Sequence, residues 1–185
     1  MESSDRLRLF CALDLPESAI EPVVAWQGRE LRGGRIVPPE NLHLTLAFLG
    51  SRPAADVPVI ADALRDAVDG SELRLRLRDY RETRSVGMLT FEDVGGHAGE
   101  LATRLQELLE GLGVYERMGS GDSRARPWLP HLTVLRFRDQ PRLRPPLPEL
   151  GEVVPSDAAV YISRLRPGGA VYESVEVVPL DNTVR

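Results

Sequence analysis

Two stretches of this chain repeat each other: PENLHLTLAF at Pro39–Phe48 and PWLPHLTVLR at Pro127–Arg136. Both contain His-Leu-Thr followed by Leu or Val, and both follow a proline-containing approach. The two histidines lie 88 residues apart, close to half of the 185-residue chain. The simplest explanation is two similar lobes that each contribute one equivalent strand.

The spacing within each motif has a chemical meaning. In a strand, residues i and i+2 face the same side, so His43 and Thr45 project together, and so do His131 and Thr133. The intervening leucines then point into a core. Two facing lobes would form a cleft with two imidazoles, one neutral and one protonated near pH 7, as paired general acid–base catalysis requires. The two hydroxyls can donate to the non-bridging oxygens of a phosphate.

The remaining patterns predict an α+β fold with a largely antiparallel sheet, because hairpins and helices are interspersed without a strict βαβ rhythm. A capping box at Ser18–Glu21 predicts the start of the first helix, and Gly33-Gly34 its end. Residues 119–126 are expected to form a loop, and 141–155, with five prolines, an irregular segment. Strands are predicted at 6–13, 42–49, 73–78, 86–91 and 132–137, a hairpin at 159–165 and 171–178, and further helices at 60–68 and 101–112.

Composition excludes several classes of function. All 23 basic residues are arginine, which excludes Schiff-base chemistry, a lysine phosphate cradle and a P-loop. The net charge of -5 excludes a strongly basic nucleic-acid coat but not a local arginine patch. A single cysteine, Cys11, excludes a disulfide framework and a cysteine-rich zinc site. Only three histidines remain as candidates: His43, His97 and His131.

Targeting signals are not visible in the sequence. No window approaches 18 uninterrupted apolar residues, and the polar N-terminus lacks a basic start followed by an apolar run. We therefore expect a cytoplasmic protein with no membrane association.

Four stretches together resemble one known family. They are RLRLFCALDLP at Arg6–Pro16, VPPENLHLTLAFLG at Val37–Gly50, RPWLPHLT at Arg126–Thr133 and GGAVY at Gly168–Tyr172. The chain resembles the 2H phosphoesterase superfamily, and within it the RNA 2′,3′-cyclic phosphodiesterases, historically called 2′-5′ RNA ligases. The resemblance spans nearly the whole chain in the family's order. One departure is the proline-rich stretch 141–148, where a more helical segment would be expected.

The resemblance implies a single bilobal domain over 1–185, with two pseudo-symmetric lobes, an antiparallel sheet in each, outer helices and a central cleft. It implies hydrolysis of RNA 2′,3′-cyclic phosphates to 2′-phosphates without a metal or cofactor, and slow joining or cleavage of 2′-5′ linkages. By analogy one histidine activates water and the other protonates the departing ribose oxygen; we favour His131 as the base and His43 as the acid. The partners would be RNA ends or nucleotides with a 2′,3′-cyclic phosphate. We expect a monomer with no obligate protein partner.

The family also implies a site for the nucleobase, between Phe48 and Arg136, each five residues after its histidine. A nucleobase can stack favourably between an aromatic ring and a guanidinium plane. Strict strand parity would place these two side chains opposite their histidines. Each strand must therefore end or bulge before them.

Other interpretations of these residues stay open. The enzyme could act on 2′-5′ oligoadenylate or another small phosphodiester, or the chain could be a non-catalytic module that binds RNA ends. The histidines of the two motifs could be half-buried strand residues with structural hydrogen bonds, and His97 fits a helix start. Arg74, Arg76 and Arg78 form either the solvated face of an amphipathic strand or a stripe that guides RNA. Trp128, Tyr172 and Cys11 fit packing roles.

Overall fold

The computed structural model of the protein describes residues 5–116 and 127–180, so the loop predicted over 119–126 lies outside the described residues. The expected α+β class with antiparallel sheets is confirmed, because every strand pairing within these ranges is antiparallel. In chain order the elements are β1 (Arg6–Asp14), α1 (Glu17–Glu30), β2 (Arg35–Ile36), β3 (His43–Pro53), α2 (Val57–Ala67), β4 (Arg74–Glu82), β5 (Val86–Val94), α3 (His97–Gly111), β6 (His131–Arg136), β7 (Glu152–Val153), β8 (Asp157–Arg166) and β9 (Gly169–Pro179), with 3-10 turns at Pro39–Asn41 and Ala54–Asp56.

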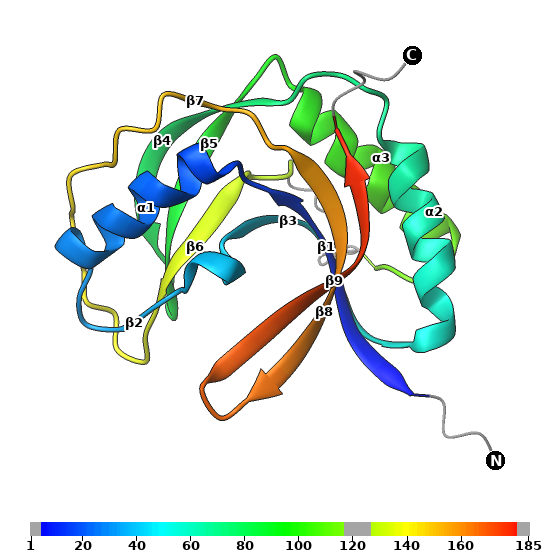
Figure 1. Cartoon of the computed structure of the whole chain (residues 1–185), viewed down its shortest axis with the longest axis horizontal. Helices are drawn as coiled ribbons and strands as arrows, with labels where there is room; N and C mark the ends of the chain where they lie inside the picture. Colours follow the sequence, from blue (N-terminus) through cyan, green and yellow to red (C-terminus); the bar gives the residue numbers. More distant parts are fainter. Residues whose placement is uncertain (1–4, 117–126, 181–185) are drawn as a thin grey trace.

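The strands form two sheets, and each His-Leu-Thr motif starts a strand of a different sheet. The first sheet has the order β3-β1-β8-β9 and the second the order β2-β6-β5-β4-β7. The motif strands β3 and β6 lie close enough to contact each other where the two sheets meet (Figure 1). Each sheet combines strands from both halves of the chain. The expectation of one bilobal domain over 1–185 stays a prediction.

The helices lie on opposite sides of the molecule. Helices α2 and α3 pack against strands of the first sheet, with contacts from α2 to β8 and from α3 to β3. Helix α1 instead lies beside the second sheet (Figure 1), where the ring of Trp26 meets Tyr80 edge-on at a centroid distance of 6.1 Å. Cys11 of β1 is buried in the core, as predicted. Burial raises the pKa of its thiol to about 12.

The predicted start of α1 is wrong by two residues, because a cap at Ser18 would place the first helical residue at Ala19, and the capping box does not form. The helix begins at Glu17 after Pro16, and no side chain caps its first turn. The Pro16 carbonyl accepts hydrogen bonds from the backbone N–H groups of Ala19 and Ile20, so the helical ladder already starts at the proline and encloses Ser18. At the other end the helix stops at Glu30, before the glycine pair.

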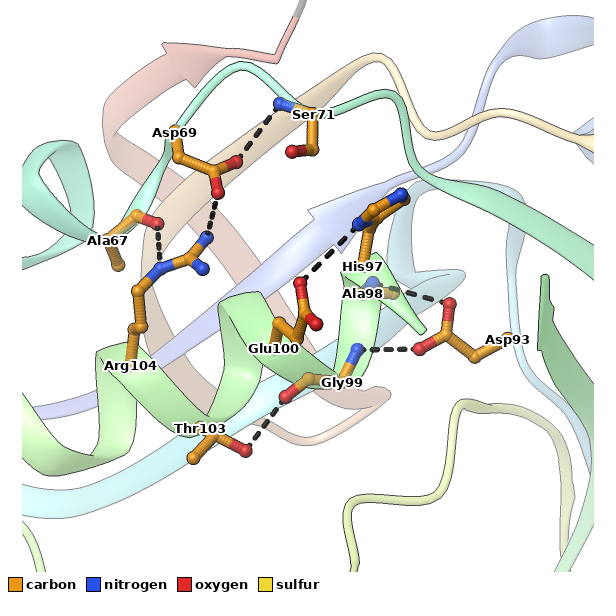
Figure 2. A network of polar contacts seen from close by, with 10 residues as sticks. All are labelled: Ala67, Asp69, Ser71, Asp93, His97, Ala98, Gly99, Glu100, Thr103 and Arg104. Carbon is orange, nitrogen blue, oxygen red and sulfur yellow. Dashed lines mark hydrogen bonds and ion pairs between the residues drawn. The ribbon is translucent and has the colours of Figure 1, made fainter. Parts of the chain in front are cut away.

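A network of polar contacts fixes the start of α3 (Figure 2). Both carboxylate oxygens of Asp93 accept hydrogen bonds from the first turn, from the backbone N–H of Ala98 at 3.2 Å and of Gly99 at 2.7 Å. Because carboxylates are stabilised at helix N-termini, this arrangement anchors the helix. His97 is the first residue of α3 and lies 3.4 Å from Glu100, which confirms the predicted helix-start position.

The alternating strand β4 has the two faces that its sequence predicts. Leu73, just before the strand, and Leu75 within it are buried, whereas Arg74 and Arg76 are exposed and lie 3.7 and 3.8 Å from Glu152. These ion pairs offset the positive charge of the arginine stripe formed by Arg74, Arg76 and Arg78, which fits a solvated strand face. A role of the stripe in guiding RNA stays a prediction. The segment 141–155 is irregular as predicted, apart from the two residues of β7.

Candidate active site

A hollow of about 530 Å³ lies where the two sheets meet. We call it the central hollow. Its walls include every residue that the sequence analysis placed in the site. They are His43, Thr45 and Phe48 from β3, and His131, Thr133 and Arg136 from β6. The structure therefore brings together two motifs that lie far apart in the sequence.

Each motif strand contains the bulge that the sequence analysis required. In β3, Thr45 pairs with Ala12 and Ala47 pairs with Cys11, which leaves Leu46 as an extra residue. An extra residue reverses the alternation of side chains beyond it. Phe48 consequently returns to the side of His43 and lines the central hollow.

Strand β6 repeats this irregularity at the equivalent position. Thr133 pairs with Met88 and Leu135 with Gly87, so Val134 is the extra residue. The first six residues of both motif strands have the same burial sequence, with half-buried positions at the histidine and threonine and an exposed sixth residue. Arg136 thereby returns to the side of His131.

The bulged carbonyls are held by glutamine side chains from two helices. Gln106 of α3 donates to the carbonyl of Leu46 at 2.8 Å, and Gln27 of α1 donates to that of Val134 at 2.9 Å. The Gln27 amide also donates to Val37 at 3.0 Å. The Val134 carbonyl also accepts from the backbone N–H of Val37 at 3.1 Å, so Gln27 is its second donor. These contacts fix the backbone at each bulge. Sequence analysis missed both glutamines.

Both catalytic candidates are oriented in the same way. The Nδ1 of His43 lies 2.8 Å from the carbonyl of Asn41, and the Nδ1 of His131 lies 2.9 Å from that of Leu129. A carbonyl can only accept, so each Nδ1 carries the proton and donates. Nε2 is then the nitrogen with which each ring can exchange a proton with a ligand.

Aromatic side chains enclose His43. Its ring centroid lies 4.8 Å from that of Phe10, 5.2 Å from Tyr172 and 6.2 Å from Tyr161. Burial lowers the pKa of His43 to about 4, and the positive charges of Arg136 and His131 act in the same direction. The ring is therefore neutral near pH 7 in the ligand-free site.

The aromatic side chains around His43 contact a half-buried carboxyl group. The Tyr161 hydroxyl donates to Asp14 at 2.5 Å, and Asp14 pairs with His43 in the β1–β3 register. Burial, with a smaller effect from the charge of Asp157, raises the pKa of Asp14 against the lowering effect of the Tyr161 hydrogen bond. Sequence analysis missed Phe10, Asp14 and Tyr161. Strand parity offered a signal for Phe10 and Asp14, because both alternate with the buried leucines of β1.

Tyr172 and Trp128 have different roles from each other. Tyr172 was expected to be a packing residue, but it lines the central hollow and meets the ring of His43. Trp128 packs against the core as expected, and its Nε1 donates to the carbonyl of Thr45 at 2.9 Å. Trp128 thus connects the approach to one motif with the strand of the other.

Phe48 offers a half-exposed aromatic face at the mouth of the central hollow. Its side chain is 50% exposed, and the Arg8 guanidinium carbon lies 5.0 Å from its ring centroid. In the ligand-free structure Arg8 therefore occupies the face of Phe48 on which a planar group could stack. Sequence analysis did not single out Arg8, although it has the same parity as Phe10 in β1.

The tip of the β8–β9 hairpin closes one side of the central hollow. Asn41 donates from its side-chain amide to Ala170 at 2.8 Å, and Arg35 donates to the carbonyl of Gly168 at 2.9 Å. Gly169 has a φ of 124°, which favours glycine, and a Cβ there would lie 2.6 Å from an Arg35 nitrogen. The hairpin is thus held against the approach to the first motif.

Within residues 5–116 and 127–180, no three His, Cys, Asp or Glu side chains are grouped so that they could hold a metal ion. Among the helices of the same ranges, none has the length and apolar character to cross a membrane.

Comparison with known proteins gives a consistent result. The profile of LigT like Phosphoesterase matches residues 13–80. An RNA 2′,3′-cyclic phosphodiesterase of Thermus thermophilus is 36% identical over 182 residues, covering 92% of this chain and 88% of that protein. The chain belongs to the LigT-like 2H phosphoesterase family. An RNA 2′,3′-cyclic phosphodiesterase of Methanocaldococcus jannaschii is another relative of this LigT-like protein, 25% identical over 179 residues, with 92% and 99% coverage.

Solved structures confirm the LigT-like fold. Escherichia coli LigT in complex with NADP+ superimposes with a TM-score of 0.80 at 27% identity, covering 97% of this chain and all of that one. TT0787 of Thermus thermophilus gives a TM-score of 0.78 at 32% identity, with 96% and 100% coverage. The two-sheet arrangement of this LigT-like chain is therefore the one its relatives have.

Proposed function

We propose that this protein hydrolyses the 2′,3′-cyclic phosphodiester of an RNA end or a nucleotide to a 2′-phosphate. The observation that carries the proposal is the matched pair of motifs: each histidine has its Nδ1 held by a carbonyl two residues earlier, and each is followed by a threonine in the same hollow. Paired imidazoles suit one proton removal and one proton donation at a single phosphorus. Relatives named RNA 2′,3′-cyclic phosphodiesterase support this choice of substrate.

The reaction needs one base, one acid and groups that stabilise charge. In our proposal Nε2 of His131 takes a proton from water, and the resulting hydroxide attacks the phosphorus. The bond from phosphorus to the 3′ oxygen breaks, and Nε2–H of protonated His43 gives its proton to that oxygen. Thr45 and Thr133 donate hydrogen bonds to the non-bridging oxygens, where negative charge increases in the transition state.

The neutral state of His43 in the empty site fits this assignment only if substrate raises its pKa. A bound phosphodiester brings a negative charge next to His43 and also offsets the charge of Arg136, which lowers the pKa of His43 in the free site. His43 would then become protonated when substrate binds, and the protonated ring could act as the acid. This order keeps the proton off His43 until there is an oxygen to receive it.

The test is hydrolysis of a 2′,3′-cyclic nucleotide and of a short RNA with a 2′,3′-cyclic end, with EDTA present. We expect activity in the chelator and a loss of about 10²-fold or more in both His43→Ala and His131→Ala, as for removal of a positioned acid or base. His97→Ala is the matched control, because His97 lies on α3 outside the central hollow. Full activity in both motif variants would overturn the proposal.

Product analysis separates this activity from its alternatives. The proposed reaction yields a 2′-phosphate, whereas a 2′-5′ phosphodiesterase would shorten a 2′-5′-linked oligonucleotide and leave the cyclic end intact. A module that only binds RNA ends would bind the cyclic end and release no product. Weak 2′-5′ ligation, the monomeric state and the cytoplasmic location stay predictions.

A further inference from the structure

A second hollow lies beside the central one. It measures about 590 Å³ and is lined by the glycine pair before β2, by Arg35 of β2, and by the end of β6 with the residues after it, Arg136 to Asp139. We call it the side hollow. Arg35 and Arg136 line both hollows, and these two residues are direct partners in the β2–β6 register. The two hollows therefore share a wall made of two arginines.

The side hollow is cationic. Three arginines, Arg35, Arg136 and Arg138, line it together with one acidic residue, Asp139. All four residues are exposed, and none of the three arginines is ion-paired with a carboxylate of the described residues. This contrasts with Arg74 and Arg76 on β4, which both approach acidic side chains. Unpaired arginines side by side favour a phosphate, which accepts from the guanidinium fork.

A single nucleotide leaves the side hollow without a ligand. In the proposed reaction its cyclic phosphate lies in the central hollow between the histidines. The rest of an RNA chain continues from the 5′ oxygen of the same terminal nucleoside, and the first group along it is a phosphodiester. Arg136 is at once the proposed contact of the terminal nucleoside and the near wall of the side hollow.

From this juxtaposition we infer that the side hollow binds the phosphodiester that precedes the cyclic end, with Arg35 and Arg138 as its ligands. The inference rests on the proposed function and deepens it: the preferred substrate is an RNA chain rather than a mononucleotide. The close approach of β2 to β6 makes the shared wall possible, because a Cβ at Gly34 would lie 2.5 Å from the carbonyl oxygen of Arg136.

Three substrates that differ by one group test the inference. They are a nucleoside 2′,3′-cyclic phosphate, the same compound with a 5′-phosphate, and the dinucleotide that ends in the same cyclic phosphate. We expect kcat/KM to rise about fivefold on adding the 5′-phosphate, near the upper end of what one exposed ion pair contributes. The dinucleotide should share that gain. Its logarithmic salt dependence should be steeper by roughly 0.7, as for one more phosphate contact on a single strand.

Arg138→Gln should bring the ratio of kcat/KM between dinucleotide and mononucleotide back toward one. Arg81→Gln is the matched control, since Arg81 is also an exposed arginine of the second sheet but lines neither hollow and lies outside the arginine stripe of β4. Thermal unfolding of both variants checks that the fold is retained.

Three results would overturn the inference: equal kcat/KM for all three substrates, a gain that needs the second base but not the 5′-phosphate, or an equal loss in the Arg81 variant. If the mononucleotide is hydrolysed and no gain appears, only the side hollow is refuted. If none of the three substrates is hydrolysed, the proposed function itself fails.

Discussion

Gln27 and Gln106 make the same contact in the two sheets. Each side-chain amide donates to the carbonyl of the bulged residue three positions after a motif histidine, at 2.9 Å for Val134 and 2.8 Å for Leu46. The two glutamines come from helices that pack on different sheets. Each bulge thus has a donor fixed by tertiary packing, and the bulge is what turns Phe48 and Arg136 toward their histidines.

Replacing Gln27 should destabilise the fold. Gln27 is 1% exposed, and Gln27→Met removes the side-chain donor from two buried carbonyls, those of Val37 and Val134. We expect a fall of about 1–3 kcal/mol in the free energy of unfolding, the usual cost of leaving a buried polar group unpaired. The Val37 carbonyl loses its donor, whereas the Val134 carbonyl keeps the backbone N–H of Val37 at 3.1 Å. Urea denaturation measures it, and Gln140→Met, at an exposed glutamine after β6, is the control. An equal effect in both variants would contradict the role assigned to Gln27.

The pKa of His43 should respond to charge in the central hollow. Burial is the largest cause of its low value of about 4, and the charge of Arg136 lowers the pKa further, so Arg136→Gln should raise it part of the way toward the ordinary value. Sulfate, a dianion that stands in for phosphate, should also raise it. At pH 5 to 6 the free ring is neutral and the sulfate-bound ring gains a proton, so NMR titration of the imidazole signals shows both shifts. A pKa unmoved by sulfate would refute proton uptake with substrate.

Sulfur at the bridging 3′ position should identify the acid. A thiolate leaves without protonation, so the variant that lacks the acid should recover most of its rate on this substrate. We expect recovery in His43→Ala and not in His131→Ala, measured as single-turnover rates on the oxygen and sulfur substrates. Recovery in His131→Ala instead would exchange the two roles.

Phe48 should contribute to binding through the nucleobase. Stacking of a base on an aromatic side chain is worth about 1–3 kcal/mol, so Phe48→Ala should raise KM about 5- to 150-fold with a smaller change in kcat. Phe48→Tyr, which keeps an aromatic face, should restore KM. A ribose 2′,3′-cyclic phosphate without a base provides the control substrate. If Phe48→Ala reduces hydrolysis of this substrate as strongly, Phe48 acts on something other than the base.

The sequence predicts the motif residues well because two independent constraints coincide there. Strand periodicity pairs each histidine with its threonine, and the family resemblance places Phe48 and Arg136 in the same site. The need for a bulge could be stated from parity alone, and the register shifts confirm it. The residues that hold the bulges could not be predicted, because Gln27 and Gln106 act through contacts 107 and 60 residues away.

Short sequence patterns give a wrong prediction where a neighbouring residue already makes the hydrogen bonds that the pattern would make. The pattern Ser18–Glu21 has the right spacing for a capping box, yet the carbonyl of Pro16 already accepts the first helical hydrogen bonds. From the sequence alone, Tyr172 could not be distinguished from the packing residues of the predicted hairpin. Only the packing of β9 beside β8 and the ring contact with His43 reveal its place in the site.

The distribution of strands between the two sheets decides whether either half of the chain could fold by itself. A cut between β4 and β5 would leave a complete His-Leu-Thr motif on each fragment. Neither fragment would hold a complete sheet, because β1 and β3 need β8 and β9, while β6 would lose β2 and β5 would lose β4. The duplicated motif is therefore not a duplicated folding unit, and chemistry and folding both depend on interlacing the two halves of the chain.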